Sequence, residues 1–271
     1  MSAGSRTRRR LGALLGAELI CALLLIGGPQ PAPSGPALAA STPAFAPAPS
    51  PRTVSTPDGR STHLIDLGAP GGAELLDRVA AEMPAATAAV TDFWGPQWPL
   101  DITVVVAGSA QQFAVLAGAG PDVAATTTAQ RITFSPGAVE MTDHDLRMVL
   151  RHELFHYAAR AQTAADAPVW LTEGVADFVG RPRTPPAPVA ADAALPTDAE
   201  LATAGPLRSA AYDRAWSFAS YVADTYGTAA LRELYLAVGG HHRADLDGAA
   251  RAALGTAWPE VLSGWRQWQP S

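Results

Sequence analysis

The stretch RHELFHYAAR, residues 151–160, constrains the fold more than any other part of the chain. It carries His152, Glu153 and His156 in the order H-E-x-x-H, inside a run of helix-forming residues. In an α-helix, side chains four positions apart leave the same face about one turn apart, so both imidazoles can reach one ion. The pattern therefore predicts a metal-binding helix. The alternative is an ordinary helix with a partly buried histidine and a surface glutamate.

The ligands available to a metal ion are limited by the composition of the chain. Zinc binds imidazole, carboxylate and thiolate groups, and a catalytic zinc site uses three protein ligands and leaves a fourth position for water. Cys21, the only cysteine, lies in an apolar N-terminal stretch, so the remaining ligands must be His, Asp or Glu. The metzincin continuation H-x-x-G-x-x-H is absent, because Ala159 and Gln162 occupy its Gly and final His positions. Glu173, seventeen residues beyond His156, is the carboxylate that the next predicted helix offers instead.

The segment around Glu173, WLTEGVA at residues 170–176, resembles the W-L-x-E-G-x-A signature of the gluzincins. The resemblance is closest to the compact peptidase MA-like branch and to the catalytic core of M1-type aminopeptidases, and it extends over roughly residues 63–268. It implies that zinc is held by His152, His156 and Glu173. It also implies that Glu153 is the general base that takes a proton from a zinc-activated water during hydrolysis of a peptide bond.

Asp177 lies four residues after Glu173, on the same face of the same predicted helix. In gluzincins an acidic residue at this offset hydrogen-bonds the first zinc histidine, which fixes its tautomer and raises its basicity. The resemblance therefore implies a hydrogen bond between Asp177 and His152. The alternative is a solvated aspartate on a helix surface.

Peptide hydrolysis also needs a donor for the oxyanion that forms at the carbonyl, and in M1-like gluzincins this donor is a tyrosine beyond the third ligand. Tyr212, at the start of the helix after a long loop, is the first candidate in this chain. Tyr221 and Tyr226 are alternatives, whereas Tyr157 follows a ligand on the zinc helix and is expected in the core. A packing role remains open for any tyrosine in a predicted helix.

The pattern of apolar residues predicts an α+β fold, with a small mixed sheet packed on the zinc-binding helix and a mostly helical C-terminal part. The strand at 131–134 is a candidate for the edge strand that pairs with substrate in gluzincins, or an ordinary sheet strand. A Pro- and Ala-rich surface loop is expected over 181–206. The predicted strands cover residues 62–67, 101–107 and 130–135, and the predicted helices cover 72–94, 142–161, 170–178, 210–226, 228–238, 246–254 and 258–268.

The N-terminal residues have the order of a secretory signal peptide. Four arginines precede an apolar stretch at 11–28, and a small-residue cleavage site follows near Ala40. We therefore expect a signal peptide over 1–40, a Pro/Ala-rich linker over 41–60 and one metallopeptidase domain over 61–271, with the protein secreted or displayed at the cell surface. The alternative is an uncleaved signal anchor at 11–28.

The charge of the exported part argues against nucleic acid as a partner. Residues 1–40 contain four Arg and one Glu of the totals of 19 and 25, which leaves 15 Arg against 24 acidic residues and a net charge of −9. The expected partner is a peptide or protein substrate, and the expected state is a monomer. A different class of function stays open, a zinc-stabilised binding or cell-surface module, which a closed four-ligand site would favour.

Overall fold

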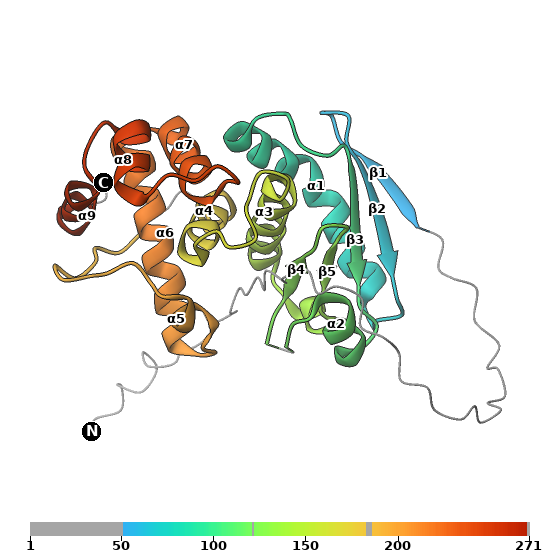
Figure 1. The fold of residues 1–271 in the computed structure, drawn as a ribbon. Helices are drawn as coiled ribbons and strands as arrows, with labels where there is room; N and C mark the ends of the chain where they lie inside the picture. The colour runs from blue at the N-terminus through green and yellow to red at the C-terminus, as the bar shows by residue number, and fades with distance from the viewer. Residues whose placement is uncertain (1–50, 121, 183–185, 270–271) are drawn as a thin grey trace, which may run out of the picture.

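The structure, a computed structural model, describes residues 51–120, 122–182 and 186–269. It has the predicted α+β fold, in which a sheet-containing N-terminal half precedes a helical C-terminal half (Figure 1). The strands are β1 (Arg52–Ser55), β2 (Ser61–Asp66), β3 (Asp101–Val106), β4 (Ala125–Thr127) and β5 (Ile132–Phe134). The helices are α1 (Gly72–Trp94), α2 (Ala110–Ala117), the 3-10 helix η1 (Pro136–Glu140), α3 (Asp143–Ala159), α4 (Val169–Gly180), α5 (Asp198–Ala202), α6 (Pro206–Tyr226), α7 (Thr228–Gly239), α8 (Leu246–Leu254) and α9 (Trp258–Gln267).

The sheet is mixed and has the strand order β1-β2-β3-β5-β4. The inner strands β2, β3 and β5 run parallel, while β1 and β4 pair antiparallel at the two edges. The suggestion that the strand at 131–134 is an edge strand is therefore wrong, because β5 lies between β3 and β4. The edge strand on that side of the sheet is β4, which contacts α3. This short strand was not predicted from the sequence.

The expected linker over 41–60 is also wrong in its last part. Arg52–Ser55 forms β1 and pairs with Ser61–Leu64, so the sheet begins before residue 61. Arg60 is only 2% exposed and its guanidinium lies over the Trp98 ring, at 3.5 Å from the centroid. The proposed segments 1–40 and 41–50 lie outside the described residues.

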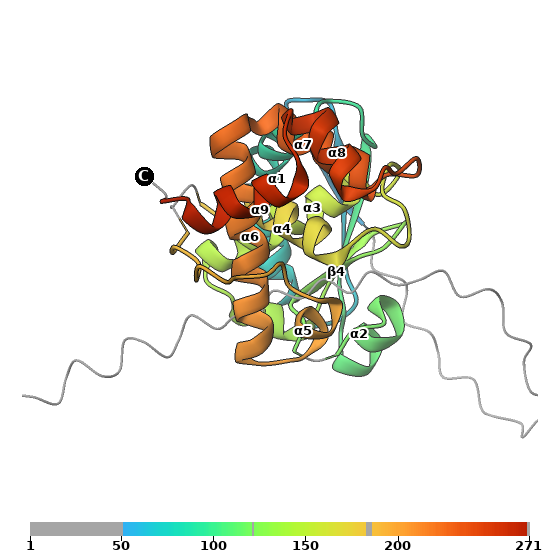
Figure 2. The same ribbon diagram turned by 60° about the vertical axis from the view of Figure 1, so that its left-hand side comes forward.

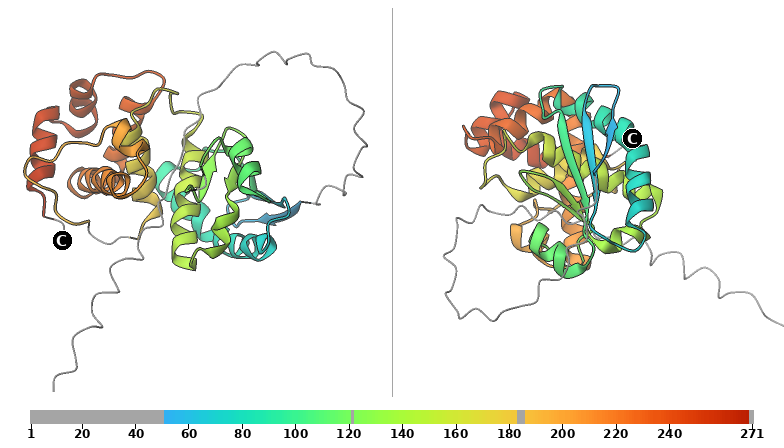
Figure 3. Two further views of the ribbon diagram at one scale, coloured as in Figure 1. Left: turned by 90° about the horizontal axis from the view of Figure 1, so that it is seen from below. Right: turned by 90° about the vertical axis from the view of Figure 1, so that its right-hand side faces the viewer.

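Helices α1 and α3 pack together and enclose the main core with the inner strands. α1 spans Gly72–Trp94 as predicted, with Pro84 inside it. At its C-terminal end Trp94 makes edge contacts with Phe155 of α3 and Tyr235 of α7, with ring centroids 5.6 and 5.3 Å apart. This aromatic cluster joins the sheet-containing half to the helical half. The two halves lie side by side with α3 and α4 between them (Figure 1 and the left view of Figure 3), and Figure 2 shows the helical half in front of the sheet.

The C-terminal half is built on the close approach of α4 and α6. Gly174 permits this approach, because a Cβ atom at this position would lie 2.6 Å from the carbonyl oxygen of Ala215. The predicted loop over 181–206 contains the short helix α5, which begins with a capping box formed by Thr197 and Glu200. Among the described residues, no helix combines the length and the apolar character needed to cross a bilayer.

Candidate metal centre

The helix that carries H-E-x-x-H begins at a sequence-encoded cap. The hydroxyl oxygen of Thr142 accepts a hydrogen bond from the amide of Asp145, as expected for a helix start. Seventeen residues of regular helix follow, so His152 and His156 lie one turn apart on the same face. Both are buried: His152 is fully enclosed and the His156 side chain is 8% exposed. The alternative of an ordinary helix with a partly buried histidine and a surface glutamate is wrong, because Glu153 is 1% exposed.

Helix α4 brings Glu173 to the two histidines. The Nε2 atoms of His152 and His156 are 3.1 Å apart. Glu173 Oε2 lies 3.3 Å from His152 Nε2, and Glu173 Oε1 lies 3.5 Å from His156 Nε2. One potential ligand atom from each residue therefore faces a common point, and the three atoms lie within 4.8 Å of one another. The arrangement can hold a metal ion, as the sequence predicted.

The dimensions and the chemistry of this group fit zinc. Zinc binds nitrogen and oxygen ligands at about 2.0–2.1 Å, so tetrahedral ligand atoms are about 3.3 Å apart. The two imidazole nitrogens are 3.1 Å apart, and each lies 3.3 or 3.5 Å from a different oxygen of the Glu173 carboxylate, all close to that value. Glu173 Oε1 is buried and accepts no hydrogen bond among the described residues. A buried carboxylate oxygen without a donor is costly, and a metal ion at this point would satisfy it.

Asp177 lies on the opposite side of the His152 ring from the ligand atoms. Its Oδ1 is 2.9 Å from His152 Nδ1, and its side chain is 1% exposed. The expected contact between these residues is thus present. It places the ring proton on Nδ1, where it is donated to Asp177, and leaves the Nε2 lone pair available for a metal. Asp177 itself is turned away from the point that the three ligands share.

The charges of the group call for a cation. Burial lowers the pKa of His152, but hydrogen bonds to Asp177 and Glu173 outweigh it and raise this pKa to about 10. For Glu173 the directions are opposite. Burial raises the pKa of its carboxyl group, but the charge of His156 and the hydrogen bond to His152 outweigh burial and lower this pKa to about 2. The protein alone therefore stabilises a positive charge between these side chains, which a metal ion can supply in place of a proton.

Glu153 is held by a residue that the sequence analysis missed. The hydroxyl of Thr127, on the edge strand β4, donates a hydrogen bond of 2.6 Å to Glu153 Oε2, and it is 2.9 Å from the Glu153 carbonyl oxygen. This contact joins the edge of the sheet to the metal-binding helix. No local signal in the sequence could have identified Thr127, because the contact depends on how β4 pairs with β5.

Of the three tyrosines considered as donors, the structure brings Tyr212 to the centre. Its hydroxyl donates a hydrogen bond of 3.0 Å to Glu173 Oε2, and the residue is 4% exposed. The hydroxyls of Tyr221 and Tyr226 instead contact each other at 3.3 Å. Tyr157 is buried, as expected, and donates to the carbonyl oxygen of Asp101.

Arg181 is the second residue that the sequence analysis missed. It follows the last turn of α4, and its guanidinium lies 2.7 Å from Asp177 Oδ2 and 2.7 Å from Asp213 Oδ1. Burial lowers the pKa of Arg181, but Asp177 and Asp213 together raise it above its ordinary value. The spacing of four residues from Asp177 was a signal that could have suggested an ion pair.

No protein-family model and no curated protein matches the chain. Among solved structures, it is similar to a mutant of a two-domain M1 zinc metallopeptidase bound to L-tryptophan, with 18% identity and a TM-score of 0.48 over 79% of this chain and 50% of that chain. It is also similar to the M1 zinc metallopeptidase from Deinococcus radiodurans, with 18% identity and a TM-score of 0.46 over 81% and 52% of the two chains. The chain thus spans about half the length of these structures.

Proposed function

We propose that this protein is a zinc metallopeptidase of the gluzincin type. The observation that carries the proposal is that the buried cluster offers three ligand residues, with no fourth His, Cys, Asp or Glu in the group among the described residues. His152, His156 and Glu173 share one point, while Asp177 contacts the Nδ1 side of His152 and so lies outside that point. Structural zinc sites are usually closed by four protein ligands, whereas catalytic sites have three and keep one position open. In the described part of the chain, three residues form this site.

The side chains have distinct tasks in hydrolysis of a peptide bond. Zinc held by His152, His156 and Glu173 would act as a Lewis acid and lower the pKa of a water molecule towards neutrality. Glu153 takes the proton from the attacking water at its carboxylate and passes it to the leaving amine. The hydrogen bond from Thr127 keeps this carboxylate in one orientation. Asp177 holds the proton of His152 on Nδ1 throughout, so Nε2 stays available.

Tyr212 is the proposed donor for the oxyanion that develops at the scissile carbonyl. Its hydroxyl already lies beside the third ligand, where it donates to Glu173. A donor to the oxyanion has to turn from Glu173 towards the carbonyl as the substrate enters. Hydrogen bonds of this kind commonly form only when the substrate is bound. The same hydroxyl therefore has two roles, holding the carboxylate in the free protein and stabilising the oxyanion during the reaction.

The experiment that tests the proposal measures zinc content and peptide cleavage together. The purified protein and its Glu153→Gln variant are analysed for zinc by mass spectrometry and tested on a mixed peptide library. We expect one zinc per chain in both proteins, and cleavage about 10²- to 10⁴-fold slower in Glu153→Gln. Glu82→Gln is the matched control. Glu82 lies on α1 and pairs with Arg147 of α3, the helix that carries Glu153, and we expect its replacement to leave zinc content and cleavage unchanged.

The rival function is a zinc-stabilised binding or cell-surface module of the same fold. Such a module needs no general base, so the burial of Glu153 and its hydrogen bond to Thr127 would serve no purpose in it. One zinc per chain without cleavage by the wild-type protein would favour the module. Absence of zinc from both proteins would overturn the metal site itself.

We also propose a partner and a location for the protein. The partner is a peptide or protein substrate, as the proposed hydrolysis requires. We propose export of the chain because the arginine-rich start and the apolar stretch at 11–28 have the order of an export signal. Cell fractionation with an antibody against the folded part tests export, and N-terminal sequencing of the exported protein distinguishes cleavage near Ala40 from an uncleaved anchor. Gel filtration tests the proposed monomeric state.

A further inference from the structure

The carboxylate that orients the first zinc ligand is itself held from the other side. Asp177 Oδ1 is 2.9 Å from His152 Nδ1, and Asp177 Oδ2 is 2.7 Å from an Nη atom of Arg181. Oδ2 is buried and accepts no aligned hydrogen bond in the part of the chain that the structure describes. The guanidinium of Arg181 is thus its charge partner, and the orientation of Asp177 depends on two contacts, one at each oxygen.

Arg181 is fixed in turn by helix α6. Its second Nη atom lies 2.7 Å from Asp213 Oδ1, and its guanidinium lies 4.6 Å from the centre of the Trp216 ring. The planar fork of arginine can engage two carboxylates in fixed directions and stack flat on an aromatic ring, whereas an ammonium group is a compact point charge without that planar geometry. A continuous series of contacts therefore runs from α6 through Arg181 and Asp177 to His152.

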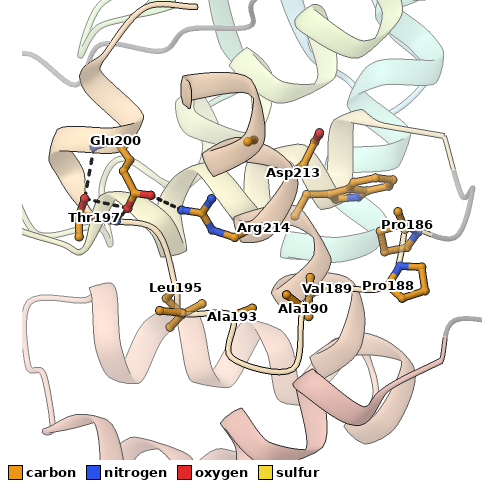
Figure 4. Close-up of a pocket in the computed structure, with 14 residues that line it drawn as sticks. Pro186, Pro188, Val189, Ala190, Ala193, Leu195, Thr197, Glu200, Asp213 and Arg214 are labelled. Atoms are coloured by element: carbon orange, nitrogen blue, oxygen red, sulfur yellow. Dashed lines mark hydrogen bonds and ion pairs between the residues drawn. The ribbon is translucent and has the colours of Figure 1, made fainter. Parts of the chain in front are cut away.

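The two ends of this series differ in their exposure to solvent. The Asp177 side chain is 1% exposed and that of Arg181 is 19% exposed, whereas the Asp213 side chain is 64% exposed. Asp213 and Trp216 also line an open cavity of about 620 Å³ between α6 and the segment 186–197 (Figure 4). Water screens the ion pair between Arg181 and Asp213 more strongly than the ion pair between Arg181 and Asp177. The contact between Arg181 and Asp177 is therefore the stronger of the two.

From this geometry we propose that Arg181 is a positioning residue for the metal centre. It holds the Asp177 carboxylate in the plane and at the distance that keep His152 Nε2 pointed at the shared ligand point. The inference rests on the proposed zinc site. It adds Arg181, which acts on the metal through Asp177 and His152. The simpler alternative is that Arg181 only fastens α4 to α6, in which case its loss would lower stability and leave zinc affinity unchanged.

The test compares zinc affinity among matched arginine variants. Zinc Kd is measured by competition with a chromophoric chelator at 25 °C, on protein shown to be folded by circular dichroism. For Arg181→Met we expect Kd to rise about tenfold, the lower end of the range for loss of an outer partner of a metal ligand. For Arg181→Lys, which keeps the charge but loses the fork, we expect a smaller rise. Arg147→Met is the control, because Arg147 makes a two-pronged pair with Glu82 at 2.9 and 3.1 Å on the metal-binding helix but contacts neither Asp177 nor a ligand.

A second reading separates orientation from stability. Cobalt replaces zinc in the wild type and in each variant, and its visible absorption reports the geometry of the ligands. We expect a changed spectrum in Arg181→Met and an unchanged one in Arg147→Met. Should Arg181→Met not fold, the same comparison is made with Arg181→Lys and with Asp213→Asn, which removes the negative charge at the outer end of the guanidinium.

The possible outcomes bear on different claims. Equal Kd values and equal cobalt spectra for Arg181→Met and the wild type would overturn the positioning role while leaving the zinc site intact. Equal losses in Arg181→Met and Arg147→Met would overturn it too, since the effect would then be a general one. A wild-type protein that binds neither metal would overturn the proposed function, and this inference with it.

Discussion

Two regions of this protein bury charged side chains, and they balance charge differently. At the start of the sheet, Arg60 is 2% exposed, pairs with Asp58, donates a hydrogen bond of 3.0 Å to the Pro96 carbonyl and stacks on Trp98. One positive charge thus meets one negative charge. We call this group the Arg60 cluster.

The metal centre has an excess of negative charge instead. Asp177 is paired with the guanidinium of Arg181, whereas the buried Glu173 faces two imidazoles that bind metal only when neutral. A buried charge is tolerated when it is paired, as in the Arg60 cluster. The comparison teaches that the Arg60 cluster is complete as it stands, whereas the metal centre needs a cation.

The largest expected effect is the stabilisation of the protein by zinc. At a free zinc concentration of 1,000 times Kd, binding adds about 4 kcal/mol to the free energy of unfolding. For a domain of this size that raises Tm by about 8 to 16 °C. Thermal unfolding with zinc and with a chelator measures the increment. In Glu173→Gln, a neutral amide replaces the third ligand, and we expect the increment to fall below about 1 kcal/mol.

Replacement of Arg60 tests the other region of the comparison, the Arg60 cluster. Arg60→Met removes the cation and leaves the Asp58 carboxylate, whose side chain is 27% exposed and can be partly hydrated. We expect a loss of about 2 to 3 kcal/mol in unfolding free energy, below the range for a fully buried pair. Urea denaturation should give the same loss with zinc and with chelator. A loss that depended on zinc would contradict the independence of the two regions.

The pH dependence of the metal-free protein sharpens the difference further. The pKa of His152 is raised from 6.5 to about 10, so its stabilising contribution is complete below pH 6.5 and is lost as pH rises through 10. The pKa of Glu173 is lowered from 4.5 to about 2, so its contribution is complete above pH 4.5 and is lost as pH falls through 2. With chelator, urea midpoints should therefore decline from pH 6.5 towards 10.

Zinc should offset this decline. Metal binding requires the neutral imidazole, so the zinc-dependent increment in unfolding free energy should grow as pH rises from 6.5 towards 10. Arg60→Met is the control, because it leaves the protonation of His152 untouched and should keep both slopes. A chelator-treated protein whose stability rises across this range would show that His152 is not the protonated group.

The local parts of both regions could be predicted from the sequence. Helix α1 has the predicted bounds, and so does α8, because each has a helical spacing of apolar residues and an interruption at its end. His152 and His156 were predicted because they lie on one face of a helix. Glu173 and Asp177 were predicted from the resemblance of the segment around Glu173 to the gluzincins, and their spacing puts them one turn apart on the next helix.

The contacts that depend on tertiary structure could not be predicted. Thr127 reaches Glu153 only because the three-residue strand β4 pairs with β5 at the edge next to α3. Arg60 is buried only because β1 extends the sheet into a segment that its composition marked as a linker. In both cases the partner lies on a different element, and neither spacing nor propensity encodes which elements meet.

Tyr212 gives the smallest expected effect on the metal and separates its two proposed roles. Tyr212→Phe keeps the ring and removes the hydroxyl that donates to Glu173. Glu173 also faces His152 and His156, so zinc Kd should rise by less than about tenfold, below the usual range for loss of an outer partner. Cleavage measured at saturating zinc should fall by about 10²- to 10³-fold, the usual cost of losing an oxyanion donor.

A fall in cleavage no larger than the change in Kd would mean that the hydroxyl only orients the third ligand. Tyr221→Phe is the matched control. It also removes a tyrosine hydroxyl from α6, but that hydroxyl contacts Tyr226 and not Glu173.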